Sequence, residues 1–262
     1  DGHKTSRITR LIGSLKIFLY GPDEIAEMIA GHRSHIILAV SEHSQREWQR
    51  YYRLSSSKFK NLPNSVDTEH FQPDLESHKQ QSSRQSRIAL RILFIGSLTY
   101  LKGLDRLGAT IEKARQTAKN WEFIIATPSS FNTEKFASKQ NVTIRKGVSF
   151  AELPDLYRSC DVMYFPSIYE GFEMVTLEAL SSGLPVVGTD VGAISVLYKA
   201  GFPGVYRIDP DDFDQISDAF EIAASRWKDP AEKRLLHNLV DANYGISTWS
   251  QKLIEILEAC HD

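Results

Sequence analysis

The chain has 262 residues, of which 42% are hydrophobic and 24% are charged, and this excludes a mainly disordered protein because disorder requires low hydrophobicity and high net charge. Its 31 Lys and Arg against 33 Asp and Glu give a formal net charge of −2, so no basic surplus indicates a nucleic-acid partner. Two cysteines are too few for a disulfide framework, and at roughly 150 residues per domain the length predicts one to two domains.

Along the chain, short apolar runs alternate with longer amphipathic segments, which is the pattern of an α/β protein with a mostly parallel sheet. Because the runs are continuously apolar, we expect strands that helices cover on both faces. The expected strands are His35–Val40, Ile92–Ile95, Trp121–Ala126, Val142–Ile144, Val162–Phe165, Leu184–Val187 and Val205–Ile208. The expected helices are Leu104–Ala118, Ala151–Ser159, Met174–Ser182, Ala193–Ala200, Phe213–Arg226, Pro230–Asn243 and Trp249–Ala259.

The strand at His35–Val40 stands apart, because a sheet needs neighbouring strands and little chain precedes it. We therefore expect residues 1–55 to be the tail of one domain, followed by a complete second domain. The start at Asp1–Lys16 is polar and basic, unlike a signal peptide, and the longest apolar runs are too short to span a bilayer. These features predict a cytoplasmic fragment that begins within a longer protein.

The most informative stretch is Pro166–Gly192, where a strand ends, a loop carries Glu170 and Gly171, and a helix begins near Met174. The free N–H groups at a helix N-terminus attract anions, and a glycine lets a ligand approach the backbone. Glu178 follows one turn above Met174. Carboxylates beside such an anion site suit a ligand with both hydroxyls and phosphates. Alternatively, the two glutamates are only favourable partners of a helix dipole.

This stretch resembles the signature of retaining GT-B glycosyltransferases of family 4, E-G-F-x-x-x-x-x-E-A followed by G-x-P-V-V. Here Glu170-Gly171-Phe172 precedes Glu178-Ala179, and Gly183-Leu184-Pro185-Val186-Val187 follows. Other family motifs are matched in the right order from about residue 35 onward. They are Val40-Ser41-Glu42, Pro63-Asn64-Ser65-Val66-Asp67 with Phe71 and Pro73, Phe94-Ile95-Gly96-Ser97-Leu98 with Lys102-Gly103, Leu153 with Tyr157, Asp161-Val162, Pro166-Ser167 and Trp249.

The resemblance implies a Rossmann-like parallel sheet of the GT-B type, with residues 1–55 as a remnant of the N-terminal acceptor domain. Residues 56–245 would form the C-terminal nucleotide-sugar-binding domain and 246–262 a helix that crosses back. The implied activity is a retaining hexosyl transfer from a nucleoside diphosphate sugar to an acceptor sugar, lipid or small metabolite. With most of the acceptor domain missing, we expect the chain alone not to transfer sugar at a useful rate.

The resemblance also assigns roles to single residues. Glu170 would lie against the transferred sugar, Glu178 would bind the ribose hydroxyls, and Lys102 would neutralise the diphosphate, with Glu170 and Lys102 as the catalytic pair. Helix dipole and cation would stabilise the leaving group without a metal or a cofactor. The implied donor-binding residues are Gly96, Ser97, Lys102, Glu170, Gly171, Phe172, Glu173, Met174, Val175 and Glu178.

Three positions depart from the family's pattern. Ser97 replaces an arginine and so removes one phosphate-binding cation. Glu173 replaces a small residue, and its charge either lies near the phosphates or turns outward. Thr127-Pro128-Ser129-Ser130 stands where a Gly-rich turn is expected, so the family's contacts there cannot be transferred.

Several other interpretations remain open. The chain could be a non-catalytic nucleotide-sugar-binding module, as Ser97 and the missing domain suggest, or a GT-B-type epimerase or phosphorylase. Asp209-Pro210-Asp211 has the D-x-D spacing of metal-dependent transferases, but the proline and Asp212 favour a turn and a helix cap. The basic, apolar stretch Arg7–Tyr20 is either a membrane-surface helix, which would make the protein peripheral, or a helix packed under the missing domain.

Overall fold

The structure is a computed structural model that describes residues 22–74 and 89–259. The chain divides into two compact units, Asp1–Asn61 and Leu62–Asp262. The stretch Arg7–Tyr20, for which we weighed a membrane-surface helix, lies outside the described residues. None of the described helices combines the length and the apolar character needed to cross a bilayer.

The first unit pairs two short parallel strands beside two helices. In chain order its elements are α2 (Pro22–Arg33), β1 (Ile37–Ala39), α3 (Glu42–Tyr52), the 3₁₀ turn η1 (Ser56–Lys58) and β2 (Phe59–Asn61). β1 lies parallel to β2 with Ile37 opposite Phe59. Its core consists of Ala39, Tyr52, Leu54 and Phe59. α3 begins at Ser41, whose hydroxyl accepts a hydrogen bond from the N–H of Ser44 at 3.1 Å, as a capping serine should.

The boundary between the two units lies after Asn61, at the end of β2, whereas the sequence suggested a boundary after residue 55. Residues 56–61 belong to the first unit because β2 pairs with β1 there. Whether this unit is a remnant of an acceptor domain stays a prediction.

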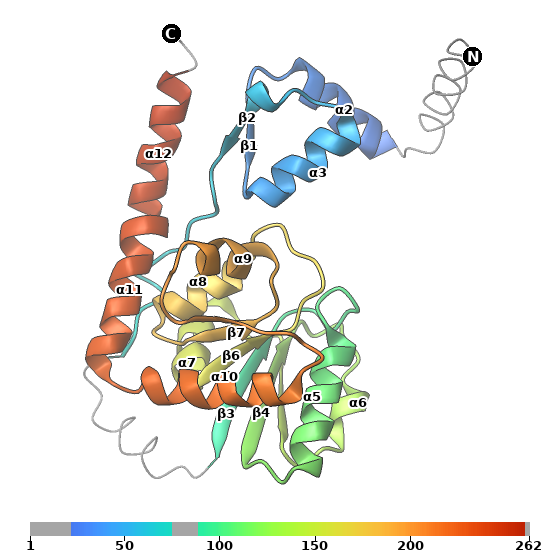
Figure 1. Cartoon of the computed structure of the whole chain (residues 1–262), viewed down its shortest axis with the longest axis vertical. Coiled ribbons are helices and arrows are strands. Elements are labelled where there is room, and N and C mark those ends of the chain that lie inside the picture. The colour runs from blue at the N-terminus through green and yellow to red at the C-terminus, as the bar shows by residue number, and fades with distance from the viewer. Residues whose placement is uncertain (1–21, 75–88, 260–262) are drawn as a thin grey trace. The chain divides into compact units, whose positions relative to one another are not determined.

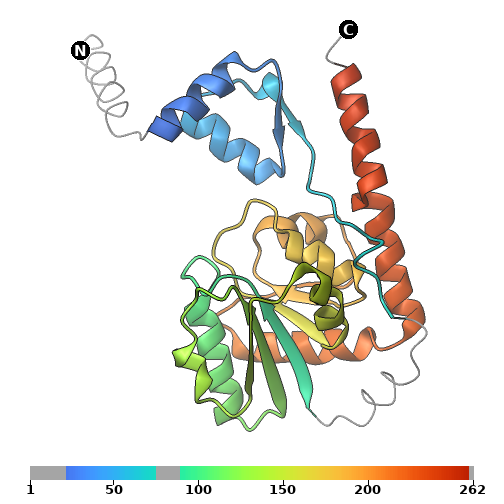
Figure 2. The ribbon, with the colours of Figure 1, turned by 180° about the vertical axis from the view of Figure 1, so that it is seen from behind.

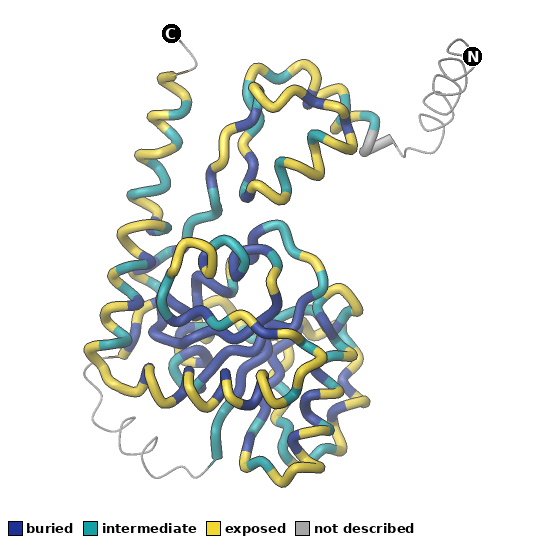
Figure 3. The backbone as a smooth tube through the Cα atoms, viewed as in Figure 1, coloured by how far each residue is buried: buried dark blue, intermediate teal, exposed yellow. Residues whose placement is uncertain are grey.

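The second unit is built on a six-stranded sheet in which every strand is parallel to its neighbours (Figure 1). The strand order is β5-β4-β3-β6-β7-β8. The strands are β3 (Leu90–Ile95), β4 (Trp121–Thr127), β5 (Val142–Lys146), β6 (Val162–Phe165), β7 (Val186–Gly188) and β8 (Val205–Arg207). The central strands are buried, as the continuously apolar runs predict (Figure 3).

Helices cover both faces of this sheet. α5 and α10 pack on one face, where Leu107 and Phe220 join a core with Ile92, Phe123 and Tyr164 of the strands. Figure 2 gives the view from behind, with the green helix α5 towards the viewer's left and the teal strand β3 near the middle of the unit. The helices of this unit are α5 (Leu104–Gln116), α6 (Glu134–Ala137), α7 (Leu153–Arg158, preceded by the 3₁₀ turn η2, Phe150–Glu152), α8 (Met174–Ser181), α9 (Gly192–Lys199), α10 (Phe213–Arg226), α11 (Pro230–Tyr244) and α12 (Ile246–Glu258).

The entry into the second unit is tied to the end of α11. The N–H of Val66 donates to the carbonyl of Tyr244 at 2.9 Å, and Val66 forms a parallel β-bridge with Gly245. The hydroxyl of Thr68 donates to the Asp241 carboxylate at 2.5 Å. Residues 62–74 are thereby fixed against the helices that follow the sheet.

The predicted fold class is confirmed: the protein is α/β with a parallel sheet. All seven expected strands and all seven expected helices are present, with their ends shifted by up to three residues. The sequence did not predict β2, α2, α3 or α6.

Candidate functional site

The strand order puts a topological switch point between β3 and β6. From β3 the chain proceeds to β4 on one side, whereas β6 lies on the other side and leads on to β7. In open α/β sheets, ligands bind outside the carboxyl ends of the strands at such a point. The loops that follow β3 and β6 carry Lys102 and Glu170, respectively.

Lys102 and Glu170 meet at this switch point. The Lys102 Nζ atom lies 2.6 Å from Glu170 Oε1, and the two side chains are 32% and 11% exposed. The hydroxyl of Ser167 donates to the same carboxylate oxygen at 2.9 Å. The ammonium group also lies 5.7 Å from the centre of the Phe165 ring. The structure therefore brings together the two residues predicted to be catalytic, although they are 68 positions apart in the sequence.

The two loops contact each other through their backbones as well. The N–H of Ile168 donates to the carbonyl of Leu101 at 2.8 Å. Arg106, on the first turn of α5, donates from Nη1 to the carbonyls of Pro166 and Ser167, both at 3.1 Å. Sequence reasoning missed Arg106, because a guanidinium that binds main-chain carbonyls of a distant loop leaves no pattern in the sequence.

Gly103 allows this close approach. Its φ of +75° lies in the left-handed region, and a Cβ atom on it would lie 2.2 Å from the Pro166 carbonyl oxygen. Both the conformation and the space thus require glycine. In the Lys102-Gly103 dipeptide, Lys102 supplies the cation and Gly103 lets the two loops pack closely.

The other residues predicted in the loop after β3 are Gly96 and Ser97. Gly96 has φ +148°, and its N–H donates to the carbonyl of Ala126 at 3.0 Å. A Cβ atom there would meet only the Lys102 side chain, at 4.0 Å. Ser97 is half-buried and carries no charge, so it cannot supply the positive charge of the arginine that it replaces.

At the start of α8, the predicted residues separate into exposed and buried ones. Met174 is 38% exposed, while Gly171 and Val175 are half-buried. Phe172 is buried; its ring lies 6.1 Å from that of Tyr244, and its carbonyl accepts a hydrogen bond from Asn64 Nδ2 at 2.9 Å. The Phe172 side chain therefore belongs to the core rather than to an open site.

Glu173 does not turn outward, which was one of the two expectations for it. It is 7% exposed, and its carboxylate accepts hydrogen bonds from the hydroxyl of Thr176 and from the N–H of Ala193, each at 2.8 Å. Glu173 faces inward because the N–H groups and the dipole at the N-terminus of α9 attract a carboxylate.

Glu178 is 9% exposed and lies beside α7. The hydroxyl of Tyr157, which is fully buried, donates to Glu178 Oε2 at 2.7 Å. Burial raises the pKa of Glu178, although the hydrogen bond from Tyr157 and the charge of His70 lower it. The His70 ring stacks on Phe150 with centroids 4.2 Å apart. The sequence predicted the carboxylate but not its tyrosine partner.

Asp209-Pro210-Asp211 forms a turn, and Asp212 caps α10, as the sequence favoured. The N–H of Asp211 donates to Asp209 Oδ1 at 3.0 Å, and that of Gln215 donates to Asp212 Oδ1 at 3.0 Å. In the part of the chain that the structure describes, no group of three His, Cys, Asp or Glu residues could hold a metal ion.

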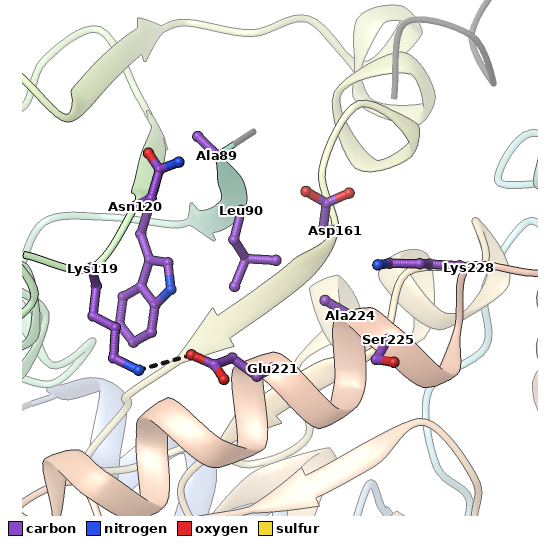
Figure 4. A pocket seen from close by; sticks show the side chains of 10 residues that line it. Ala89, Leu90, Lys119, Asn120, Asp161, Glu221, Ala224, Ser225 and Lys228 are labelled. Carbon is purple, nitrogen blue, oxygen red and sulfur yellow. Dashed lines mark hydrogen bonds and ion pairs between the residues drawn. The ribbon is translucent and has the colours of Figure 1, made fainter. Parts of the chain in front are cut away.

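A pocket lies at the amino ends of β3, β4 and β6, at the opposite ends of these strands from the candidate site (Figure 4). It has a volume of about 430 Å³. An ion pair between Lys119 and Glu221 at 2.8 Å lies on its wall. Because it lies at the other end of the strands from Lys102 and Glu170, the pocket is separate from the candidate site.

Comparison with known proteins identifies the family. Residues 89–225 match the model of the family described as "Glycosyl transferases group 1". An uncharacterised glycosyltransferase of Methanocaldococcus jannaschii is 28% identical over 224 residues, which cover 80% of this chain and 57% of that protein. The MMP alpha-(1->4)-mannosyltransferase of Mycolicibacterium hassiacum is 28% identical over 205 residues, which cover 76% of this chain and 47% of that protein.

Solved structures agree on the fold. Anabaena HepE in complex with UDP-glucose superposes with a TM-score of 0.69 at 16% identity, covering 88% of this chain and 65% of that one. The chain spans about half the length of the curated relatives it matches. The family model covers more than half of the chain and includes both loops of the switch point. The resemblance inferred from the motifs is thus confirmed: the chain belongs to the group 1 glycosyltransferases, which are family 4 enzymes with the GT-B fold.

Proposed function

We propose that this chain supplies the donor-binding half of a retaining glycosyltransferase that uses a nucleoside diphosphate sugar. The observation that carries the proposal is the ion pair of Lys102 and Glu170 at the switch point, 2.6 Å apart. A cation and a carboxylate at the carboxyl ends of β3 and β6 are the groups that a sugar diphosphate needs at the place where such sheets bind ligands.

In this proposal Glu170 accepts hydrogen bonds from hydroxyls of the transferred sugar, and Glu178 accepts them from the ribose. Lys102 lies against the diphosphate. Gly96, Ser97 and the backbone from Gly171 to Val175 line the same donor site. A charge-assisted hydrogen bond of this kind contributes about 1.5–3 kcal/mol, and its share in catalysis grows as charge develops on the leaving diphosphate.

In this proposal Lys102 binds Glu170 and a phosphate oxygen at the same time. Its ammonium group has three N–H donors, so it can keep one for Glu170 and direct another to a phosphate oxygen. The pair thereby links the transferred sugar to the leaving group through two side chains. Retention of configuration comes to the proposal from the family, since the spacing of these residues does not determine it.

The whole protein's reaction involves more than this chain's second unit. The acceptor, which we expect to be a sugar, a lipid or a small metabolite, would bind to the remainder of a two-domain enzyme. We therefore expect no useful rate of sugar transfer from the purified 262-residue chain. Appreciable turnover would overturn that expectation.

A non-catalytic nucleotide-sugar-binding module is the second candidate, and Ser97 favours it. Loss of the arginine's charge weakens stabilisation of a leaving diphosphate more than it weakens binding of the intact donor, because the charge on the diphosphate increases during the reaction. Slow hydrolysis of a bound donor would separate an enzyme from such a module.

The test is calorimetric binding of UDP, GDP, ADP and TDP, and of their sugar derivatives, with and without EDTA. We expect one nucleotide to bind tightly and EDTA to have no effect. Glu178→Gln keeps an oxygen that can accept the Tyr157 hydroxyl but removes the charge, so it should weaken binding without unfolding the chain, and Glu178→Ala should abolish binding.

Glu221→Gln is the matched control, because Glu221 lies in the pocket at the opposite edge of the sheet. Wild-type binding to none of these ligands would overturn the proposal. Equal binding by wild type and Glu178→Ala would leave a nucleotide site but remove Glu178 from it.

A further inference from the structure

The Glu173 carboxylate connects the first turns of two helices. Glu173 precedes α8 and is 7% exposed. One carboxylate oxygen, Oε1, accepts from the hydroxyl of Thr176 on α8, and the other, Oε2, accepts from the N–H of Ala193 on α9, each at 2.8 Å. The residue directly before α9 is Val191, whose apolar side chain cannot accept a hydrogen bond. Glu173 therefore caps α9 from another element, and the helix dipole favours its negative charge there.

Gly192 brings the same carboxylate into contact with the loop of Glu170. Its φ is +52°, and a Cβ atom on it would lie 1.9 Å from Glu173 Oε2 and 2.7 Å from the Glu170 Cβ. The first residue of α9 is thus packed against both glutamates. A displacement of this turn would move Glu170 and, through the ion pair, Lys102.

The charged side chain that affects the pKa of Glu173 is Glu170. The pKa of Glu173 is raised to about 7: burial is the main cause and the negative charge of Glu170 adds to it, while the hydrogen bonds from Ala193, from its own backbone and from Thr176 act to lower it. Glu170 itself is paired with Lys102. Asp190, on the loop before α9, is instead paired with Arg207 at 3.0 Å. Glu173 is therefore only partly ionised near neutral pH.

We propose that Glu173 is a positioning residue of the donor site: it holds the first turn of α9 against the loop of Glu170, and its negative charge opposes the binding of a sugar diphosphate. The inference rests on the proposed function. It concerns a residue at which this chain differs from the small residue that the family's pattern has there. Ionisation of Glu173 would place a second negative charge beside that of Glu170. The same site has Ser97 where the family's pattern has an arginine, so it lacks that positive charge.

The test compares wild type with Glu173→Gln and Glu173→Leu. The glutamine keeps the size and an acceptor for the Ala193 N–H, but it is neutral at every pH. The leucine has a similar size but leaves that N–H unpaired. The probe is the nucleotide sugar that binds most tightly among UDP-glucose, GDP-mannose, ADP-glucose and TDP-glucose. A nucleotide sugar is preferable to a free nucleoside diphosphate, because a terminal phosphate ionises with a pKa of about 6.

We expect the dissociation constant of wild type to rise roughly threefold or more between pH 6 and pH 8, from the added like charge. Glu173→Gln should bind as tightly as wild type does at pH 6 and show no such rise. Glu173→Leu should bind more weakly at both pH values, since the turn of α9 loses its cap. Glu221→Gln, at the opposite edge of the sheet, should reproduce the wild-type profile.

A second readout needs no ligand. The pKa of Glu173 is about 7 in the folded state against 4.5 for the free side chain, so the folded state retains a proton that the unfolded state releases. Wild-type stability should therefore fall as the pH rises from 4.5 to 7. The melting temperature of Glu173→Gln should not show this component, and the difference between the two proteins should grow over the same range.

Identical pH dependence of binding in wild type and Glu173→Gln would overturn the inference. So would melting temperatures of these two proteins that respond equally to pH. If the melting temperatures differ as expected but no nucleotide sugar binds wild type, the proposed function fails, and with it the role of Glu173 in a donor site.

Discussion

At the scale of single residues, Lys102 and Lys119 are a natural pair for comparison. Each forms an ion pair with a glutamate, at 2.6 Å with Glu170 and at 2.8 Å with Glu221. Each ammonium group lies over an aromatic ring, 5.7 Å from the centre of Phe165 and 5.5 Å from that of Trp121. They differ in place: Lys102 lies after the carboxyl end of β3, and Lys119 lies before the amino end of β4.

We expect Lys102→Met to weaken binding of the nucleotide sugar by about tenfold or more, because a charge-assisted hydrogen bond of about 1.5–3 kcal/mol is lost. Lys119→Met removes a similar ion pair and should leave binding unchanged. Titration calorimetry of both variants at the same salt concentration measures the difference. Equal weakening by the two substitutions would indicate a general effect of charge, and would contradict a local role for Lys102.

The sequence predicts the identity of the site residues better than it predicts their partners. Lys102, Glu170 and Glu178 stand in recognisable motifs, and the structure brings Lys102 to Glu170. The sequence left the orientation of Glu173 open between two expectations, because the N–H that its carboxylate accepts belongs to Ala193, twenty positions later in the chain. Tyr157 and Arg106 were missed as partners for the same reason, since their contacts exist only after the sheet has formed.

At the scale of elements, the strands and helices of the second unit were predictable because each buries a continuous run or a regular stripe. α10 is the clearest case: its bounds, Phe213–Arg226, were predicted correctly, and Ile216, Phe220 and Ala223 are buried. α3 was missed, because its sequence is strongly polar and buries only Tyr52 among its residues. β2 and α6 are too short, at three and four residues, to show a period.

The packing of the loop after β3 on the loop after β6 depends on Gly103, because this position needs both a left-handed backbone conformation and space beside Pro166. A pair of substitutions separates these two requirements. Gly201 has φ +67°, close to the +75° of Gly103, but a Cβ atom on Gly201 would meet nothing within 4 Å. Gly201→Ala therefore measures the cost of the left-handed conformation alone, about 1–2 kcal/mol. Gly103→Ala adds a clash with the Pro166 carbonyl.

We expect Gly103→Ala to lower the melting temperature more than Gly201→Ala does, and to weaken binding of the nucleotide sugar, since the loops of Lys102 and Glu170 must separate. Gly201→Ala should bind normally. Differential scanning fluorimetry and titration calorimetry give the two readouts. Equal losses of stability would show that the close approach to Pro166 is relieved at no cost.

At the scale of the whole molecule, the two units differ greatly in the size of their cores. Among the described residues, the first unit buries Ala39, Tyr52, Leu54 and Phe59 in its core. A core of the second unit combines side chains from three helices, α5, α6 and α10, and four strands, β3, β4, β6 and β7. A two-stranded sheet is at best marginally stable by itself, and local opening requires less free energy where few apolar side chains are buried.

We expect the backbone amides of β1 and β2 to exchange with deuterium much faster than those of β3 and β4. Hydrogen–deuterium exchange measured by mass spectrometry on the full chain resolves the two regions, because peptides from residues 37–61 and 90–127 are separate in sequence. Addition of the bound nucleotide sugar should increase protection around residues 96–106 and 166–178. Equal protection of all four strands would contradict the difference in stability.

The bridge between Val66 and Gly245 has a consequence for engineering. The chain enters the sheet unit and ends α11 at neighbouring points, joined by the bond from the Val66 N–H to the Tyr244 carbonyl. Domains whose ends lie close together tolerate circular permutation and insertion into other proteins. A short linker could therefore join these two positions, and new ends could be opened in a surface loop elsewhere. We therefore expect residues 62–245 to act as a cassette that can be moved between hosts while its switch point, with Lys102 and Glu170, is kept whole.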